Sequence, residues 1–157
     1  MAITIRHATE ADLPAISSLM LDSFVEYLPS YTNEAFAATT PQADQLAERM
    51  AEGPMWVARL DDDSVGTVSV FPLGDELYIR GMAVAPHTQG MGVGRQLLKT
   101  VEDYALAQGY KRLTLSTTPF LLRAIRLYER FGFQRIADGP HDLYGTPLFT
   151  MAKHLGD

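Results

Sequence analysis

The chain has 157 residues, of which 46% are hydrophobic and 20% charged, with a formal net charge of −6 and no cysteine. This length predicts one domain, residues 1–157, with a core large enough to fold without disulfides, and the composition excludes disordered, collagen-like and coiled-coil classes. The lack of cysteine excludes a thiolate zinc site and a cysteine nucleophile, and the acidic balance disfavours nucleic acid or an anionic membrane as partner.

The first ten residues alternate apolar and polar side chains, which predicts a strand rather than a secretory signal peptide. No run approaches the roughly 18 apolar residues of a membrane span, so we expect a cytoplasmic protein. Thr9 and Asp12 have the spacing of a capping box, and a helical stripe follows as far as Phe24. A second helix is expected from the cap at Thr40-Pro41 to the stop at Gly53-Pro54, whereas residues 25–40 predict no definite element.

Strand patterns follow from residue 55. Residues 55–60 and 65–71 predict an antiparallel hairpin around the turn at 61–64, and a third strand is expected over 76–84. The alternation of apolar residues changes parity in this third strand at Arg80-Gly81. A parity change at a glycine indicates a β-bulge, although a strand that is buried on both faces would leave parity uninformative.

The C-terminal half predicts two more helices and three more strands. A helical stripe runs through Leu97–Ala105 to a C-cap at Gly109, and residues 110–117 alternate as a strand. Thr118-Pro119 is expected to begin the next helix, which stops at Gly132, and residues 133–137 and 148–152 are expected to be strands. The order β-α-α-β-β-β-α-β-α-β-β predicts an α/β (α+β) fold, a mixed sheet covered by helices.

The segment Gln89-Gly90-Met91-Gly92-Val93-Gly94-Arg95 lies between a predicted strand and a predicted helix. Glycines there let the backbone curl around a ligand, and the free N–H groups of the helix start favour an anion such as phosphate. A tight turn without a ligand is the alternative, but three alternating glycines exceed what a turn needs. The dinucleotide fingerprint fails because Arg95 occupies the third glycine position, and the P-loop fails because no Lys-Ser/Thr follows Gly94.

The segment resembles the pyrophosphate loop of the GNAT superfamily of N-acetyltransferases, whose pattern is matched by Gln89, Gly92 and Gly94. The preceding Met82-Ala83-Val84 and the helix Ala124–Phe133, with its Leu-Tyr and Gly-Phe pairs, are similar to further parts of the family's signatures. The family has a mostly antiparallel sheet of about seven strands with a V-shaped splay between its fourth and fifth strands, flanked by four helices. This resemblance implies transfer of acetyl from acetyl-coenzyme A to an amine.

The resemblance also implies which residues hold the coenzyme. Backbone N–H groups of the loop would bind the pyrophosphate, and the strand at 82–84 would pair with the pantetheine arm. The bulge would aim amides at the thioester carbonyl. The family often has an asparagine where this chain has Leu121, so that contact is expected to be lost or supplied from nearby. The expected coenzyme-binding residues are Met82, Ala83, Val84, Gln89, Gly90, Met91, Gly92, Val93, Gly94, Arg95, Thr117 and Arg123.

Two catalytic residues are expected. Tyr128 falls on the family's tyrosine that protonates the departing thiolate, although its spacing alone also fits a core tyrosine. Glu76 is the best carboxylate candidate for the base that deprotonates the amine, and its alternative is an exposed acid at a strand start. We expect no metal, because the four histidines are scattered and form no His-x-x-x-His pair. The net charge of −6 is expected to conceal a local positive site around residues 89–95, with the surplus acid elsewhere available to attract a cationic amine.

The sequence therefore predicts an acetyl-coenzyme-A-dependent N-acetyltransferase that acts on a small-molecule or peptide amine by direct attack through a tetrahedral intermediate. A non-catalytic coenzyme-binding regulatory module of the same fold and a protein N-acetyltransferase are the alternatives. Homodimerisation is possible. The acceptor amine itself is not indicated by any motif.

Overall fold

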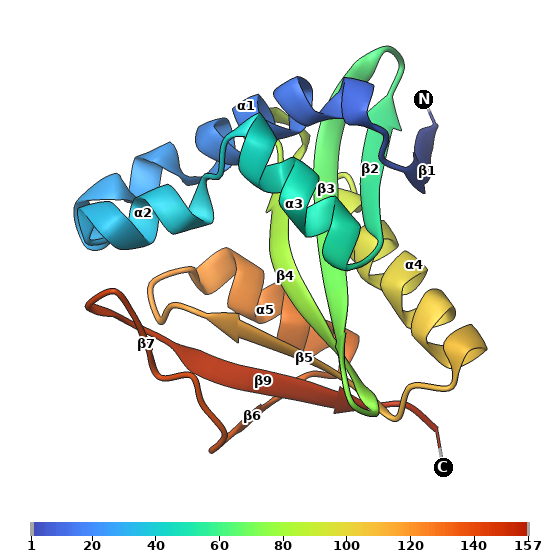
Figure 1. The fold of residues 1–157 in the computed structure, drawn as a ribbon, viewed down its shortest axis with the longest axis vertical. Helices are drawn as coiled ribbons and strands as arrows, with labels where there is room; N and C mark the ends of the chain where they lie inside the picture. The colour runs from blue at the N-terminus through green and yellow to red at the C-terminus, as the bar shows by residue number, and fades with distance from the viewer. Residues whose placement is uncertain (1, 157) are drawn as a thin grey trace.

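The computed structural model describes residues 2–156, which fold as a twisted seven-stranded sheet with helices on both faces (Figure 1). The strand order is β1-β2-β3-β4-β5-β9-β6, and all neighbours are antiparallel except β4 and β5. This arrangement confirms the predicted fold class. The sheet strands are β1 (Ile3–His7), β2 (Met55–Leu60), β3 (Asp63–Leu73), β4 (Glu76–Val84), β5 (Arg112–Thr117), β6 (Gln134–Ile136) and β9 (Phe149–His154).

Five α-helices lie within the described residues, one more than the sequence predicts. The additional helix is α2, which falls in the segment where no element was predicted. Two short strands, β7 (Asp142–Leu143) and β8 (Thr146–Pro147), form a separate hairpin between β6 and β9. The helices are α1 (Leu13–Phe24), α2 (Asn33–Thr39), α3 (Ala43–Glu52), α4 (Val93–Gln108) and α5 (Leu122–Phe131).

Two helices begin later than predicted, for different reasons. The Thr40 hydroxyl donates to the Phe36 carbonyl at 2.8 Å and so completes α2 instead of capping α3. Gln42 caps α3, and its backbone N–H donates to the Gln45 side chain at 3.0 Å. The helix expected at Pro119 begins at Leu122, because residues 118–121 first form a turn.

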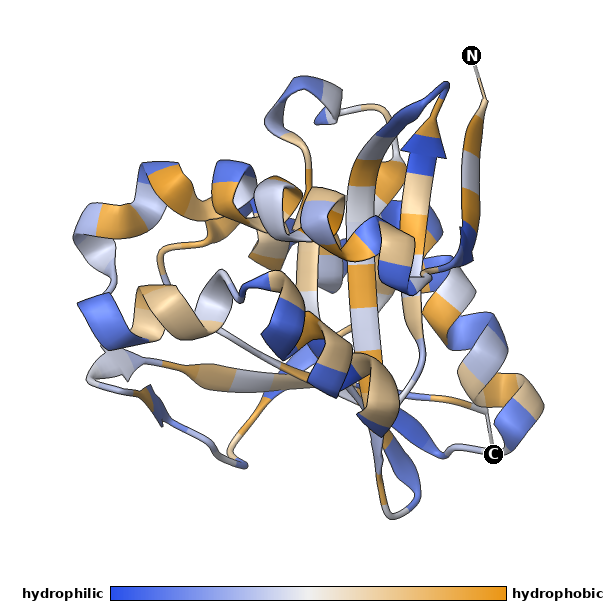
Figure 2. Cartoon of the chain, turned by 45° about the horizontal axis from the view of Figure 1, so that its top comes forward, coloured by the Kyte–Doolittle hydropathy of each residue, from blue (hydrophilic) through white to orange (hydrophobic). Residues whose placement is uncertain are grey.

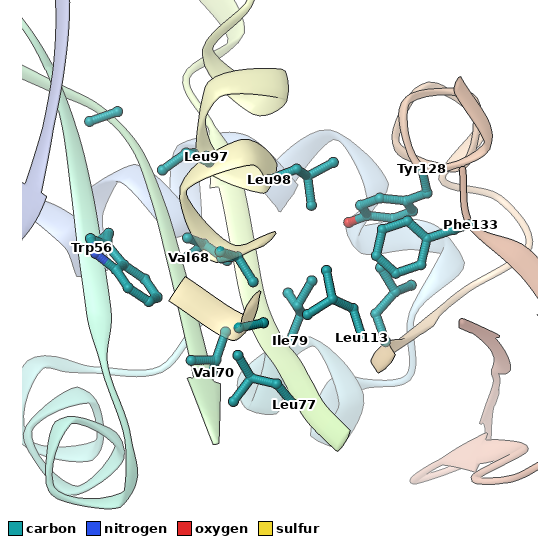
Figure 3. Close-up of a cluster of buried hydrophobic side chains, with 14 of the residues drawn as sticks. Trp56, Val68, Val70, Leu77, Ile79, Leu97, Leu98, Leu113, Tyr128 and Phe133 are labelled. Carbon is teal, nitrogen blue, oxygen red and sulfur yellow. The ribbon is translucent and has the colours of Figure 1, made fainter. Parts of the chain in front are cut away.

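The core forms two layers, one on each face of the sheet. α1 and α3 cover one face through a cluster that includes Ile16, Leu46 and Val57. α4 and α5 cover the other face, where Leu97 and Leu98 are fully buried against the strands (Figure 3). In Figure 2 the helices carry hydrophobic residues on one side and hydrophilic residues on the other, which is the pattern of helices packed on a sheet.

β4 and β5 diverge halfway along their length. They pair in parallel only between Glu76–Ile79 and Arg112–Leu115, and beyond that point they splay apart as Figure 1 shows. On its other edge β4 carries a bulge, because Thr67 faces Ala83 while Ser69 faces Arg80. Gly81 lies in this bulge with φ of 73°, a conformation that side chains disfavour. The bulge predicted from the parity change is therefore confirmed.

Candidate active site

The glycine-rich loop leads into α4 with unpaired backbone donors. Gly90 and Gly92 adopt φ values of 87° and 84°, which turn the chain sharply before the helix. The first backbone hydrogen bond of α4 runs from Gln96 N–H to the Gly92 carbonyl at 3.0 Å, so the N–H groups of residues 93–95 have no backbone partner among the described residues. Three free donors at the positive end of a sixteen-residue helix are an arrangement that favours an anion.

Gly94 serves packing rather than turn geometry. A Cβ atom there would lie 2.6 Å from Leu127 Cδ2, closer than carbon atoms approach, and 3.3 Å from Met82 Cε, which is a tight contact. By contrast, a Cβ on Gly90 or Gly92 would meet nothing within 4 Å. The three glycines therefore have two separate functions, since two shape the loop and the third lets α4 approach α5 and β4.

A cavity of about 500 Å³ opens beside this loop, between β4 and α5. Three arginines border it, Arg95, Arg123 and Arg130, whereas no Asp or Glu among residues 2–156 lines it. The Arg123 guanidinium donates to the side-chain oxygen of Gln89, which ties α5 to the loop. The positive local charge expected around residues 89–95 is therefore present. Of the predicted coenzyme residues, those that line the cavity are Met82, Ala83, Val84, Gln89, Gly90, Gly92, Val93, Gly94, Arg95 and Arg123.

β4 presents an unpaired edge to this cavity. Residues 80–84 have β3 on one side, but no strand of the described chain pairs with them on the other, because β5 has already diverged. An extended ligand could hydrogen-bond to that free edge as an added strand does. The pocket-facing glycine loop lies at the far end of the same cavity, so one elongated molecule with an anionic end would meet both features.

A second cavity of about 270 Å³ lies on the other side of the splay, under α2 and α3. Arg80 and Gly81 of the bulge line it, as does Thr117 of β5. The wall between the two cavities is a set of five residues that line both: Phe24, Met82, Leu121, Ala124 and Tyr128. The structure thus places two ligand-sized spaces side by side at the point where β4 and β5 separate.

Tyr128 is the only ionisable residue of that shared wall. Its side chain is 8% exposed and its ring packs edge-on against Phe133, with ring centroids 5.9 Å apart (Figure 3). Burial, and secondarily the neighbouring Tyr31, raises the pKa of Tyr128 to about 12. The phenol therefore stays protonated at neutral pH and is available as a proton donor to a ligand in either cavity.

Three predicted site residues lie elsewhere. Glu76 lines neither cavity, and its carboxylate pairs with Arg112 at 3.3 Å at the closed end of the splay. Thr117 lines the second cavity rather than the first, and Met91 is exposed on the loop without lining either. The assignment of Glu76 as base thus has no geometric support, because it is five residues along β4 from the bulge.

Sequence reasoning missed two arginines of the second cavity. Arg49 of α3 and Arg80 of β4 both line it, whereas no carboxylate of the described part of the chain does. Arg49 gave no signal because an arginine in the last turn of a helix is typical of a solvated surface. Among residues 2–156 there is also no cluster of metal-ligating side chains and no helix long and apolar enough to cross a membrane.

The chain is similar in sequence to a known family and to several of its members. The sequence pattern of the acetyltransferase (GNAT) family matches residues 13–133. The chain is 29% identical over 137 residues to the uncharacterized N-acetyltransferase YjgM of Escherichia coli, with 83% of this chain and 81% of that protein covered. It is 33% identical over 131 residues to human N-acetyltransferase 8B, with 78% and 55% covered. The chain thus spans only about half the length of some relatives.

Solved structures show the same fold. A Thermoplasma acidophilum PaiA N-acetyltransferase in complex with coenzyme A has a TM-score of 0.85 with this chain, with 16% identity and 98% and 99% of the two chains covered. YncA of Salmonella typhimurium with acetyl-coenzyme A has a TM-score of 0.77 with 25% identity, and 100% and 96% are covered. Both likenesses extend over essentially the whole of each chain.

Proposed function

Because the chain belongs to the acetyltransferase (GNAT) family, we propose that it transfers the acetyl group of acetyl-coenzyme A to a primary amine of a small molecule. The observation that carries the proposal is the pair of cavities that share Tyr128 in their common wall. One cavity has the shape and charge for the coenzyme, and the other offers a separate space for an acceptor. A transfer reaction needs this arrangement, because both substrates must reach one point at the same time.

The residues of the first cavity fit the coenzyme. The free N–H groups of residues 93–95 would hold the pyrophosphate, and Arg95, Arg123 and Arg130 supply positive charge for its phosphates. The unpaired edge of β4 would hydrogen-bond the amide-containing pantetheine arm. This arm would direct the thioester toward the bulge at Gly81, beside Tyr128.

The thioester supplies an activated acetyl group. In the proposed reaction the uncharged amine of the acceptor attacks the thioester carbonyl directly, so no covalent enzyme intermediate forms. The new C–N bond replaces the C–S bond, and Tyr128 donates its proton to the departing sulfur. Backbone N–H groups of the bulge around residues 81–83 would stabilise the negative charge on the carbonyl oxygen. The proton that the nitrogen releases after the attack restores Tyr128 through solvent.

A free-thiol release assay with acetyl-coenzyme A and a panel of amino acids, polyamines, aminoglycosides and peptides tests this function. Turnover on a small amine supports it. Coenzyme-dependent thermal stabilisation without turnover on any amine would instead identify a non-catalytic binding module. Turnover confined to peptides would identify a protein N-acetyltransferase, and a cavity of about 270 Å³ favours the small acceptor.

A further inference from the structure

Two guanidinium groups reach the second cavity, and one of them lies at the bulge. A Cβ atom on Gly81 would stand only 3.0 Å from Arg49 Nη1, so this nitrogen lies directly against the bulge. The other terminal nitrogen of Arg49 donates to the Ala38 carbonyl at 3.0 Å, which fixes the guanidinium between α2 and the sheet. Arg80 lines the same cavity from β4 and stacks over Phe71 at 4.7 Å.

The positive charge of this pair is only half neutralised. Arg80 pairs with Glu52 at 2.9 Å, but Glu52 is 53% exposed and does not line the cavity. No described carboxylate lies within ion-pair distance of Arg49. Burial first, and the charge of Arg80 second, lower the pKa of Arg49. Two adjacent guanidiniums therefore share one carboxylate, which leaves one positive charge facing the cavity without a counter-ion.

A buried donor in the same place also lacks a partner. The Nε–H of Arg80 is buried and makes no hydrogen bond within residues 2–156. Unpaired buried donors are rare in folded proteins, and this one adds to the excess of guanidinium donors over acceptors around Arg49 and Arg80. The guanidinium geometry suits a carboxylate, because its parallel N–H groups match the two carboxylate oxygens.

We propose that the acceptor carries a carboxylate close to its amine, as an amino acid does, and that Arg49 and Arg80 bind this carboxylate. The inference rests on the proposed acetyl transfer and names the acceptor class for that site. The position of Arg49 against Gly81 requires the carboxylate and the amine to be only a few bonds apart. Apolar neighbours in the cavity suit an acceptor with an uncharged side chain: Phe24, Tyr31, Leu115, Leu143 and Leu148.

The charge of the second cavity opposes the cationic acceptor that the net charge of the chain predicts. Acidic residues on the surface favour a cationic polyamine, but a cavity lined by two arginines and no acid repels it. A carboxylate neutralises the excess charge and leaves the amine as the one group that must lose a proton. The structure of the cavity, rather than the average charge of the chain, therefore indicates the substrate class.

The test compares matched pairs of amines in the thiol-release assay. Leucine and phenylalanine are paired with 3-methylbutylamine and phenethylamine, which lack only the carboxylate, and phosphoethanolamine is a further probe. We expect kcat/KM for each amino acid to exceed that of the matching decarboxylated amine by about 10- to 100-fold, which is the range for loss of a charged hydrogen-bonded pair. Equal or better turnover of the decarboxylated amine, or of phosphoethanolamine, would overturn the inference while leaving acetyl transfer intact.

Arg49→Gln should reduce the ratio of kcat/KM between the amino acid and the decarboxylated amine toward one, chiefly through KM for the amino acid. Arg49→Lys keeps the charge without the planar fork and should retain part of the preference. Arg126→Gln is the matched control, because Arg126 is exposed on α5 and lines neither cavity. A preference that survives in Arg49→Gln, with coenzyme binding intact as proof of folding, counts against the assignment.

A binding measurement separates this inference from the proposed function. 3-Phenylpropanoate, which has the carboxylate of phenylalanine but no amine, should bind the coenzyme-loaded protein in calorimetry and bind at least tenfold more weakly to Arg49→Gln. Binding of this anion without turnover on any amine would refute acetyl transfer but support the carboxylate site. Absence of this binding, with turnover on amines lacking a carboxylate, would refute only the carboxylate site.

Discussion

Replacement of Tyr128 by Phe tests the proposed chemistry most directly. The substitution removes only the hydroxyl, and the ring contact with Phe133 at 5.9 Å remains. If the phenol donates the proton to the leaving sulfur, kcat should fall by about 10²- to 10⁴-fold, the usual contribution of a general acid, which corresponds to about 3–5 kcal/mol of activation free energy. The coenzyme Kd should change by less than about threefold, because the loop and the β4 edge hold the coenzyme by other groups.

The same substitution should also change how the free energy of unfolding depends on pH. The folded-state pKa of Tyr128 is raised to about 12 by burial, whereas an unfolded tyrosine titrates near 10. The protonated form is therefore favoured in the folded state, so its contribution is fully present below pH 10 and is lost as pH rises through about 12. That loss amounts to about 2–3 kcal/mol of the free energy of unfolding. Tyr128→Phe should lack this decline in urea titrations at pH 9–12.

The kcat measurement needs a saturating acceptor and a control substitution at a tyrosine that lies outside both cavities. Tyr104 lines neither cavity and packs edge-on against Trp56 at 5.4 Å, so Tyr104→Phe should keep wild-type kcat. Thiol release would be measured for both variants with the best amine of the panel, between pH 6 and 9, where Tyr128 stays protonated. An unchanged kcat in Tyr128→Phe would refute the assignment of Tyr128 as the acid.

Three further variants test the fold and the coenzyme cavity. Asp12→Asn removes a carboxylate whose pKa is held well below its usual value by Arg6, so it should lower the free energy of unfolding by about 1–2 kcal/mol at pH 7 in urea titrations. The variant should also lose less stability than the wild type below pH 4, where protonation of Asp12 removes the same ion pair. Gly94→Ala forces a Cβ to 2.6 Å from Leu127 and should cost about 1–3 kcal/mol, seen as a lower Tm. Arg123→Gln should weaken coenzyme binding about two- to fivefold and reduce its dependence on salt in calorimetry; an unchanged Kd would remove this arginine from the site.

Local patterns predicted the coenzyme side of the molecule because its determinants are close in sequence. The loop glycines, the start of α4 and the parity change at Arg80-Gly81 all lie within about fifteen residues, and each has a local physical cause. The register shift opposite Ser69 and the φ of 73° at Gly81 match that local prediction. Positions of elements joined by local turns were therefore predictable to within a few residues.

The acceptor side depends on contacts between distant segments, and these were not predictable. α2 is capped by Thr32, whose hydroxyl also donates to the Tyr144 carbonyl, 112 residues away. The late start of α5 accompanies Phe120, which packs at 4.8 Å against the ring of Tyr31. Arg49 lies against Gly81 and lines the second cavity only because α3 packs across the bulge. A single sequence carries no local signal for such contacts, because tertiary packing decides them.

The distribution of charge bears more on the proposed acceptor than the average charge does. Five of the 13 Lys and Arg residues line the two cavities, where no acid among residues 2–156 accompanies them, so the described acids lie elsewhere. At physiological salt the Debye length is about 8 Å, which is shorter than the distance across such a domain. An anionic ligand inside a cavity therefore responds to the arginines around it and hardly at all to the distant acids. Two substrates that each carry an anionic group can consequently bind to an acidic protein, provided that these groups enter separate arginine-lined spaces.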